Sequence, residues 1–224
     1  MVQELTAPPT GRMVVGLTGC FGSGKTTVAH LFEELGAFVV SADHLAHEAL
    51  EKGNEPFEKL RILFREALDE SGRGFDRRKL GRIVFANTEK RKKLEALVHP
   101  YVFKRIAEEI ADAEERVLVL EIPLLFETGY DRYCFPNLVV KASGKEIAKR
   151  LKEKGYSEKD VRQRLAVQMP LEEKMKRADY VIDNTGSLKK TKEQVKQIWT
   201  QIDLALKGAN KTYAKGKNES ISKK

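Results

Sequence analysis

The sequence of 224 residues has few cysteines and no long apolar run. Two cysteines, Cys20 and Cys134, are too few for a disulfide framework and suit a reducing compartment. The longest apolar runs, such as 117–120 and 122–126, are far too short to cross a bilayer. No charged and then apolar signal segment opens the chain. These absences predict a soluble cytoplasmic protein without a membrane partner.

Acidic residues are outnumbered, so the chain has a formal net charge of +8, but the excess is unevenly placed. Residues 207–224 contain six lysines and a single glutamate, which leaves the rest only modestly basic. Basic chain ends are usually solvated and mobile. We expect a disordered leader at 1–12 and a basic disordered tail at 207–224. We expect no nucleic-acid partner, with the tail as the one place where an acidic partner could bind.

The stretch 16–27 reads GLTGCFGSGKTT and follows an apolar β-type run. Gly19, Gly24, Lys25 and Thr26 fit the phosphate-loop pattern G-x-x-x-x-G-K-[ST]. Glycines let successive backbone N–H groups face phosphate oxygens, and the helix that follows adds its positive end. In this pattern the lysine reaches the β- and γ-phosphates, and the hydroxyl of Thr26 coordinates Mg²⁺. The expected nucleotide-binding residues are Gly22, Ser23, Gly24, Lys25, Thr26 and Thr27.

Five short strand patterns alternate with helical patterns. They lie at 13–18, 37–41, 117–122, 137–141 and 179–183. This alternation predicts an α/β fold, a five-stranded parallel sheet with helices on both faces. The domain would span 13–206, and its last helix would cover 191–206.

Two helical segments interrupt the alternation. Residues 43–115 show helical stripes and no strand, and this is far longer than a strand crossover needs. We therefore expect an all-helical insertion there, punctuated at 87–88 and 99–100. Residues 144–168 predict a polar helical hairpin, in which Gly155 ends one helix and Ser157 with Asp160 forms a capping box for the next.

Three acidic residues, Asp43, Glu121 and Glu127, follow predicted strands, where ligands collect in such sheets. Asp43 could accept a proton from an acceptor hydroxyl, or could simply cap a helix. Glu121 could hold a Mg²⁺-bound water, or could be a structural group at a strand end. The basic hairpin 144–168 could be a solvated face, or a closing lid whose arginines contact the transferring phosphoryl group.

Together these residues resemble the dephospho-CoA kinase family, whose architecture is similar to that of nucleoside monophosphate kinases. The similarity runs from about Val14 to Trp199. Besides the phosphate loop and Ala42-Asp43, it rests on five further motifs. These are Asp76-Arg77…Leu80…Val84-Phe85, Leu94…His99-Pro100, Pro123-Leu124-Leu125-Phe126-Glu127, Arg164…Gln168-Met169, and residues 178–186.

The resemblance implies a P-loop kinase type of fold and ATP-dependent phosphorylation of the ribose 3′-hydroxyl of dephospho-CoA. The products would be coenzyme A and ADP, the last step of coenzyme A biosynthesis, with Mg²⁺ held by Thr26 and by Glu121 through water. The implied catalytic residues are Asp43 as base, Lys25, and Arg150 and Arg164 of the lid. The helical insertion would hold the acceptor, and the implied acceptor contacts are Asp43, His99, Arg77 and Leu124.

The sequence departs from the family pattern at three places. Ser41 precedes Ala42-Asp43, where the family often has a first aspartate, so a secondary carboxylate is missing. Cys20-Phe21 replaces the usual Gly-Ile of the phosphate loop, and Lys154 replaces an arginine, which removes a bidentate donor.

Two rival functions remain open from the sequence. One is a kinase of the same build that acts on a nucleoside or nucleotide. The other is a regulatory nucleotide-binding switch whose basic tail docks to RNA, although no guanine-selecting N-K-x-D pattern is present. A metal site at His44 and His47, and oxidation sensing by Cys20, are weaker alternatives.

Overall fold

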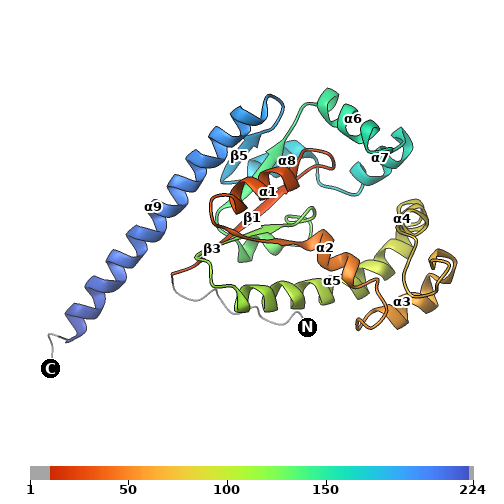
Figure 1. The fold of residues 1–224 in the computed structure, drawn as a ribbon, viewed down its shortest axis with the longest axis horizontal. Helices are drawn as coiled ribbons and strands as arrows, with labels where there is room; N and C mark the ends of the chain where they lie inside the picture. Colours follow the sequence, from red (N-terminus) through yellow and green to blue (C-terminus); the bar gives the residue numbers. More distant parts are fainter. Residues whose placement is uncertain (1–10, 222–224) are drawn as a thin grey trace.

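The computed structural model describes residues 11–221, with side chains up to Gly208. Its centre is a five-stranded sheet in which every pairing is parallel, in the order β2-β3-β1-β4-β5 (Figure 1). The strands are β1 (Met13–Gly19), β2 (Phe38–Ser41), β3 (Val117–Glu121), β4 (Asn137–Lys141) and β5 (Tyr180–Asp183). The predicted fold class is confirmed. Because β1 is the central strand, the loop after it lies in the middle of the carboxyl edge.

Helices cover both faces of the sheet because strand side chains alternate between the faces. Val15 and Val119 pack in one cluster with α1 (Lys25–Glu33) and α9 (Leu188–Ile221). Val14 and Leu118, one residue away, pack in a second cluster with α2 (Ala42–Glu48) and α5 (Thr88–Asp112). The near-continuous apolar β3 is buried at every position, as a strand covered on both faces must be.

The insertion is helical, as expected. Between α2 and α5 it contains α3 (Phe57–Leu63), a 3₁₀ turn (Arg65–Ala67) and α4 (Arg77–Ala86), with a single isolated bridge from Leu68 to Phe75. The expected break at His99-Pro100 is wrong, because α5 passes through Pro100 without ending. Val98, Val102 and Ile106 continue one buried stripe across the proline, and this packing keeps the helix intact.

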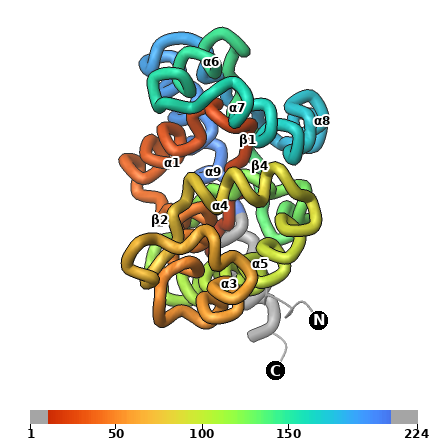
Figure 2. Tube along the Cα trace, turned by 90° about the vertical axis from the view of Figure 1, so that its right-hand side faces the viewer, coloured from red at the N-terminus to blue at the C-terminus, as the bar shows by residue number. Residues whose placement is uncertain are grey.

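The hairpin at 144–168, called the lid below, consists of α6 (Gly144–Glu153) and α7 (Glu158–Leu165). The predicted capping box of Ser157 and Asp160 is present, and Gly155 ends α6 with a left-handed φ of 76°. The lid lies at one end of the molecule, while α3 lies at the other end with α4 between them (Figure 2). A short helix, α8 (Leu171–Arg177), follows the lid.

The structure describes the chain ends only in part. Helix α9 continues to Ile221, so the expected helix end at Leu206 is wrong, whereas the expected disorder of the basic tail stays a prediction. The chain has no proline after Pro170, and the lysines and alanines of this stretch favour helix. Most of the leader lies outside the described residues, but Arg12 donates to the carbonyl oxygens of Ile110 and Ala113. Within the described chain, no helix is long and apolar enough to span a membrane.

Candidate active site

The loop from Gly19 to Gly24, called the phosphate loop below, connects β1 to α1 and forms an anion cradle. Gly22 and Gly24 have left-handed φ angles of 84° and 93°, which favour glycine. Gly24 caps α1 without a side-chain hydrogen bond, so the first N–H groups of the helix are available to a ligand. The hydroxyl of Ser23 is buried and has no hydrogen-bond partner. The loop therefore fits a bound phosphate chain, and the predicted residues 22–27 lie together here.

The Lys25 side chain is buried against the phosphate loop. Its ammonium group donates to the carbonyl oxygens of Gly19 at 3.2 Å and Cys20 at 3.3 Å. Burial lowers the pKa of Lys25, and the nearby carboxylates of Asp43 and Glu121 oppose this shift. An anionic ligand would give this buried cation a full counter-charge.

Glu121 and Thr26 link the end of β3 to the first turn of α1. Glu121 ends β3 next to β1, and its Oε1 accepts a hydrogen bond of 2.8 Å from the Thr26 hydroxyl. Burial raises the pKa of Glu121, while the Thr26 hydrogen bond and Lys25 lower it. The carboxylate thus faces the first turn of α1, directly after the phosphate loop.

This pair fits a magnesium ion that binds together with phosphates. In the described part of the chain, no group of three or more His, Cys, Asp or Glu side chains is placed to hold a metal alone. Mg²⁺ usually takes one or two protein oxygens, with phosphates and waters completing its shell. The hydroxyl of Thr26 and the carboxylate of Glu121 are oxygens of the required kind. The same finding disfavours the alternative of a metal site at His44 and His47.

Asp43 does not cap its helix. Ser41 is the N-cap of α2, and its hydroxyl accepts from the N–H of His44 at 3.4 Å. Asp43 lies in the first turn, exposed, and its charge raises the pKa of both Lys25 and Glu121. Of the two roles open from the sequence, the structure removes the cap and leaves the carboxylate near the phosphate loop.

The two lid arginines are placed differently. The guanidinium of Arg150 donates to the backbone oxygens of Ser23 at 3.2 Å and Asn184 at 2.9 Å. The guanidinium of Arg164 instead stacks on the rings of Phe21, Phe85 and Tyr156, at 5.1, 4.7 and 5.3 Å from the ring centroids. Arg150 therefore contacts the backbone of the phosphate loop, whereas Arg164 contacts a side chain of that loop.

The remaining predicted acceptor residues, Arg77, His99 and Leu124, have different described surroundings. Arg77 lines a cavity of about 240 Å³, together with His47 and Phe75. His99 and Leu124 are not among the residues lining this cavity. His99 is half-buried in α5, where burial lowers its pKa, and its ring lies 5.9 Å from that of Phe103. Leu124 follows β3, and its carbonyl oxygen accepts from the N–H of Thr128.

Glu127, the third acidic residue after a strand, has a structural partner. Its carboxylate accepts from the Lys174 ammonium at 2.9 Å and from the N–H of Met169 at 2.7 Å. Lys174 is fully buried and also donates to the carbonyl oxygen of Pro123 at 2.7 Å. Sequence reasoning missed Lys174, because its charged neighbours make α8 look like a solvated helix.

Asn184 is a second residue whose role the sequence analysis missed. Its buried side chain donates to the Ser23 carbonyl oxygen at 2.9 Å and accepts from the Thr191 hydroxyl at 3.0 Å. The residue was part of a family-like motif at 178–186, but only the fold brings that motif to the phosphate loop. Asn184 thereby ties the end of β5 to the loop after β1.

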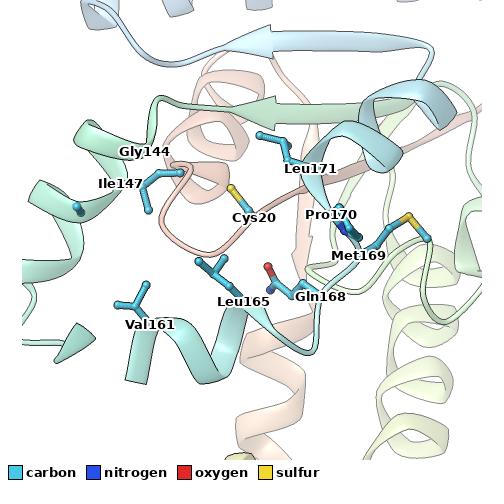
Figure 3. A pocket seen from close by; sticks show the side chains of 10 residues that line it. Cys20, Gly144, Ile147, Val161, Leu165, Gln168, Met169, Pro170 and Leu171 are labelled. Atoms are coloured by element: carbon cyan, nitrogen blue, oxygen red, sulfur yellow. The ribbon is translucent and has the colours of Figure 1, made fainter. Parts of the chain in front are cut away.

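A mostly apolar cavity of about 400 Å³ lies between the lid and Cys20 of the phosphate loop. Figure 3 shows Cys20 on the loop side, Val161 and Leu165 on the lid side, and Gln168 beside them. Burial raises the pKa of the Cys20 thiol, although Lys25 opposes the shift. A protonated thiol is a poor nucleophile, which disfavours oxidation sensing by this residue.

Comparison with known proteins gives a consistent picture. The family model described as dephospho-CoA kinase matches residues 13–190. The dephospho-CoA kinase of Bacillus licheniformis is 43% identical over 198 residues, covering 85% of this chain and 98% of that protein. The dephospho-CoA kinase of Arabidopsis thaliana is 41% identical over 193 residues, covering 84% of this chain and 83% of that protein.

Solved structures agree. A crystal structure of a Thermus thermophilus protein has a TM-score of 0.73 at 40% identity, and covers 85% of this chain and 97% of that one. A dephospho-CoA kinase from Campylobacter jejuni has a TM-score of 0.61 at 30% identity, and the match covers 84% of this chain and 96% of that one. With the phosphate loop, the Thr26–Glu121 pair and Asp43 in place, this chain belongs to the dephospho-CoA kinase family.

Proposed function

We propose that this protein transfers the γ-phosphoryl group of ATP to the ribose 3′-hydroxyl of dephospho-CoA, giving coenzyme A and ADP. Membership of the family supports the substrate. The observation that carries the chemistry is that Lys25, Glu121 and Asp43 lie close enough at the carboxyl edge of the sheet for their charges to act on one another. This arrangement gathers a phosphate-binding cation, a metal-binding group and a candidate base.

The nucleotide is held by the chain's own backbone and by Lys25. N–H groups of residues 22–27 would bind the phosphate oxygens, and the ammonium of Lys25 would leave the carbonyl oxygens of Gly19 and Cys20 for the β- and γ-phosphates. Thr26, with Glu121 through a water, would hold Mg²⁺, which neutralises charge on the phosphates. Arg150, which already lies against Ser23, would stabilise charge on the transferred group.

The acceptor is activated by Asp43. Its carboxylate would orient the 3′-hydroxyl in line with the γ-phosphate and accept the hydroxyl proton. The 3′-oxygen then bonds to the γ-phosphorus as the bond from that phosphorus to the β–γ bridging oxygen breaks, and ADP leaves. The lid would exclude water, which otherwise competes with the hydroxyl. Arg77, His99 and Leu124 stay proposed acceptor contacts, the last two after rearrangement around the ligand.

A coupled assay of ADP release with ATP, Mg²⁺ and dephospho-CoA, with mass detection of the product, tests this proposal. We expect stoichiometric ADP and coenzyme A. A panel of nucleosides and nucleoside monophosphates is the control. Phosphorylation of a panel member but not of dephospho-CoA would select the rival kinase. Slow hydrolysis without transfer, with salt-sensitive RNA binding, would select the regulatory switch. The cytoplasmic location and the absence of a nucleic-acid partner stay predictions from composition.

A further inference from the structure

Three consecutive residues at the apex of the phosphate loop are each held by the lid. The N–H of Phe21 donates to Oε1 of Gln168 at 3.0 Å. Gly22 lies so close to α6 that a Cβ there would be 2.9 Å from Cγ of Leu151. The carbonyl oxygen of Ser23 accepts from Arg150. The lid is therefore in contact with the loop that would carry the transferred phosphate.

The side chain of Phe21 makes the broadest of these contacts. Its ring lies 5.0 Å from the ring of Tyr156 in an edge-on arrangement, at an interplanar angle of 85°. The guanidinium of Arg164 lies over its face at 5.1 Å. Edge-on aromatic pairs and cation–π contacts each stabilise a specific geometry beyond simple burial. Phe21 thus touches both ends of the second half of the lid.

Arg164 extends the contact to the acceptor-side insertion. The same guanidinium stacks at 4.7 Å over Phe85 of α4, and its Nε is buried without a hydrogen-bond partner. Phe21 and Phe85 come from segments far apart in the sequence, and Arg164 lies against both. The guanidinium therefore joins the lid, the phosphate loop and the insertion by stacking rather than by an ion pair.

The second half of the lid is packed less firmly than the first, because α7 has no buried residue whereas α6 buries Leu151. Of the described residues between 144 and 171, none belongs to either hydrophobic cluster that holds the sheet and its helices. The cavity of about 400 Å³ separates Val161 and Leu165 of α7 from Cys20 of the loop (Figure 3). Since apolar packing is sparse there, the contacts of Phe21 weigh heavily in the position of the lid.

We propose that Phe21 is a positioning residue for phosphoryl transfer, holding the lid on the phosphate loop through Arg164 and Tyr156 so that water is kept from the γ-phosphate. The expected effect on ATP hydrolysis rests on the proposed function, whereas the expected effect on the position of the lid does not. A lid held less firmly would admit water and allow ATP to be hydrolysed without transfer.

The kinetic test compares Phe21→Leu, which keeps an apolar side chain but removes the ring, with Phe21→Tyr, which restores it. The matched control is Phe135→Leu, a ring that is 67% exposed and outside the lid. We expect the ratio of ATP hydrolysed to coenzyme A formed to rise about tenfold in Phe21→Leu and to return near the wild-type value in Phe21→Tyr. Thermal unfolding should be similar for the three variants. A ratio in Phe21→Leu equal to that of Phe135→Leu, or no rescue by Phe21→Tyr, would overturn the proposal.

The structural test uses amide hydrogen exchange of residues 144–168 in the ligand-free proteins. We expect faster exchange in Phe21→Leu than in Phe135→Leu, confined to the lid. Equal lid exchange in both variants would overturn the inference. If the wild-type protein fails to phosphorylate dephospho-CoA, the proposed function fails, while this exchange experiment still decides whether Phe21 holds the lid.

Discussion

Asp43 is the residue on which the proposed chemistry depends most. It is exposed in the first turn of α2, and Ser41 takes the capping role that Asp43 would otherwise fill. The Asp43 carboxylate caps no helix, and its charge acts on Lys25 and Glu121. It is therefore available to act on a ligand bound there.

We expect Asp43→Asn to lower the rate of phosphoryl transfer by about a hundredfold or more, because the amide cannot accept the hydroxyl proton. The affinity for ATP should change little, since Asp43 makes no contact with the phosphate-loop backbone in the proposed arrangement. Steady-state kinetics with dephospho-CoA and ATP titration measure both. Asp112→Asn, an exposed aspartate at the end of α5, is the control and should retain wild-type rates. Near-normal turnover of Asp43→Asn would remove this residue from the mechanism.

Glu121 gives a prediction about pH and stability. Burial raises its pKa in the folded protein above its unfolded value, so the charged form opposes folding at neutral pH. The opposition is absent below the unfolded pKa and develops as pH rises through the folded pKa. Glu121→Gln keeps an acceptor for Thr26 without the charge. We expect the ligand-free variant to be at least as stable as wild type at pH 8.

The measurement for Glu121 is thermal unfolding from pH 8 down to pH 5 without nucleotide or metal. The stability difference between Glu121→Gln and wild type should shrink as pH falls, because the wild-type carboxyl takes up a proton. Transfer activity should nevertheless drop in the variant if Glu121 helps to hold Mg²⁺. A variant that is less stable at pH 8 than at pH 5, relative to wild type, would contradict this account.

At the scale of elements, the joint between the lid and the body depends on an ion pair between a buried lysine, Lys174, and a solvent-accessible carboxylate, Glu127. Lys174 of α8 binds Glu127 and the Pro123 carbonyl oxygen, and Glu127 also receives the N–H of Met169, where the lid ends. The segment after β3, α8 and the lid exit are thus tied at one point. The buried charge is that of Lys174, and the carboxylate and the carbonyl oxygen compensate it.

We expect Lys174→Met to lower the free energy of unfolding by about 2 kcal/mol, because Glu127 and the Pro123 carbonyl oxygen lose a charged hydrogen-bond donor. Chemical denaturation measures this change. Lys176→Met is the matched control on the same helix. Lys176 pairs with Glu173 in solvent, so its loss should leave stability unchanged within error. Equal effects from the two lysines would show that burial of Lys174 contributes nothing.

On the scale of the whole molecule, α9 contributes core residues along its length up to Leu206, within the part whose side chains are described. Its described buried apolar residues are Val195, Ile198, Ile202 and Leu206, spaced three or four apart to face α1 and the sheet. We expect a chain that ends after Gly208 to keep the thermal stability and the transfer rate of the full chain. A loss of several degrees in melting temperature, or of most activity, would show that the basic end has a structural or catalytic role.

Much of the fold could be predicted because its signals are local. Buried parallel strands need continuous apolar runs, such as Val117–Leu120, and the phosphate loop needs glycines at fixed spacing. The Ser157 cap was likewise predicted from a four-residue pattern. The helix break at His99-Pro100 was wrong because packing of Val98 and Val102 overrides a local signal.

The sequence by itself therefore determined the sheet, the phosphate loop, the helical insertion and the family, since all four depend on neighbouring residues or on recurring motifs. Only the tertiary structure decided that Thr26 bonds Glu121, that Asn184 and Arg150 meet at Ser23, and that Arg164 stacks on Phe21 and Phe85. Those partners are far apart in the chain. The spacing of residues along the sequence does not specify which side chains meet when strands and helices pack. Those contacts depend on how all the strands and loops at the sheet edge are arranged in space.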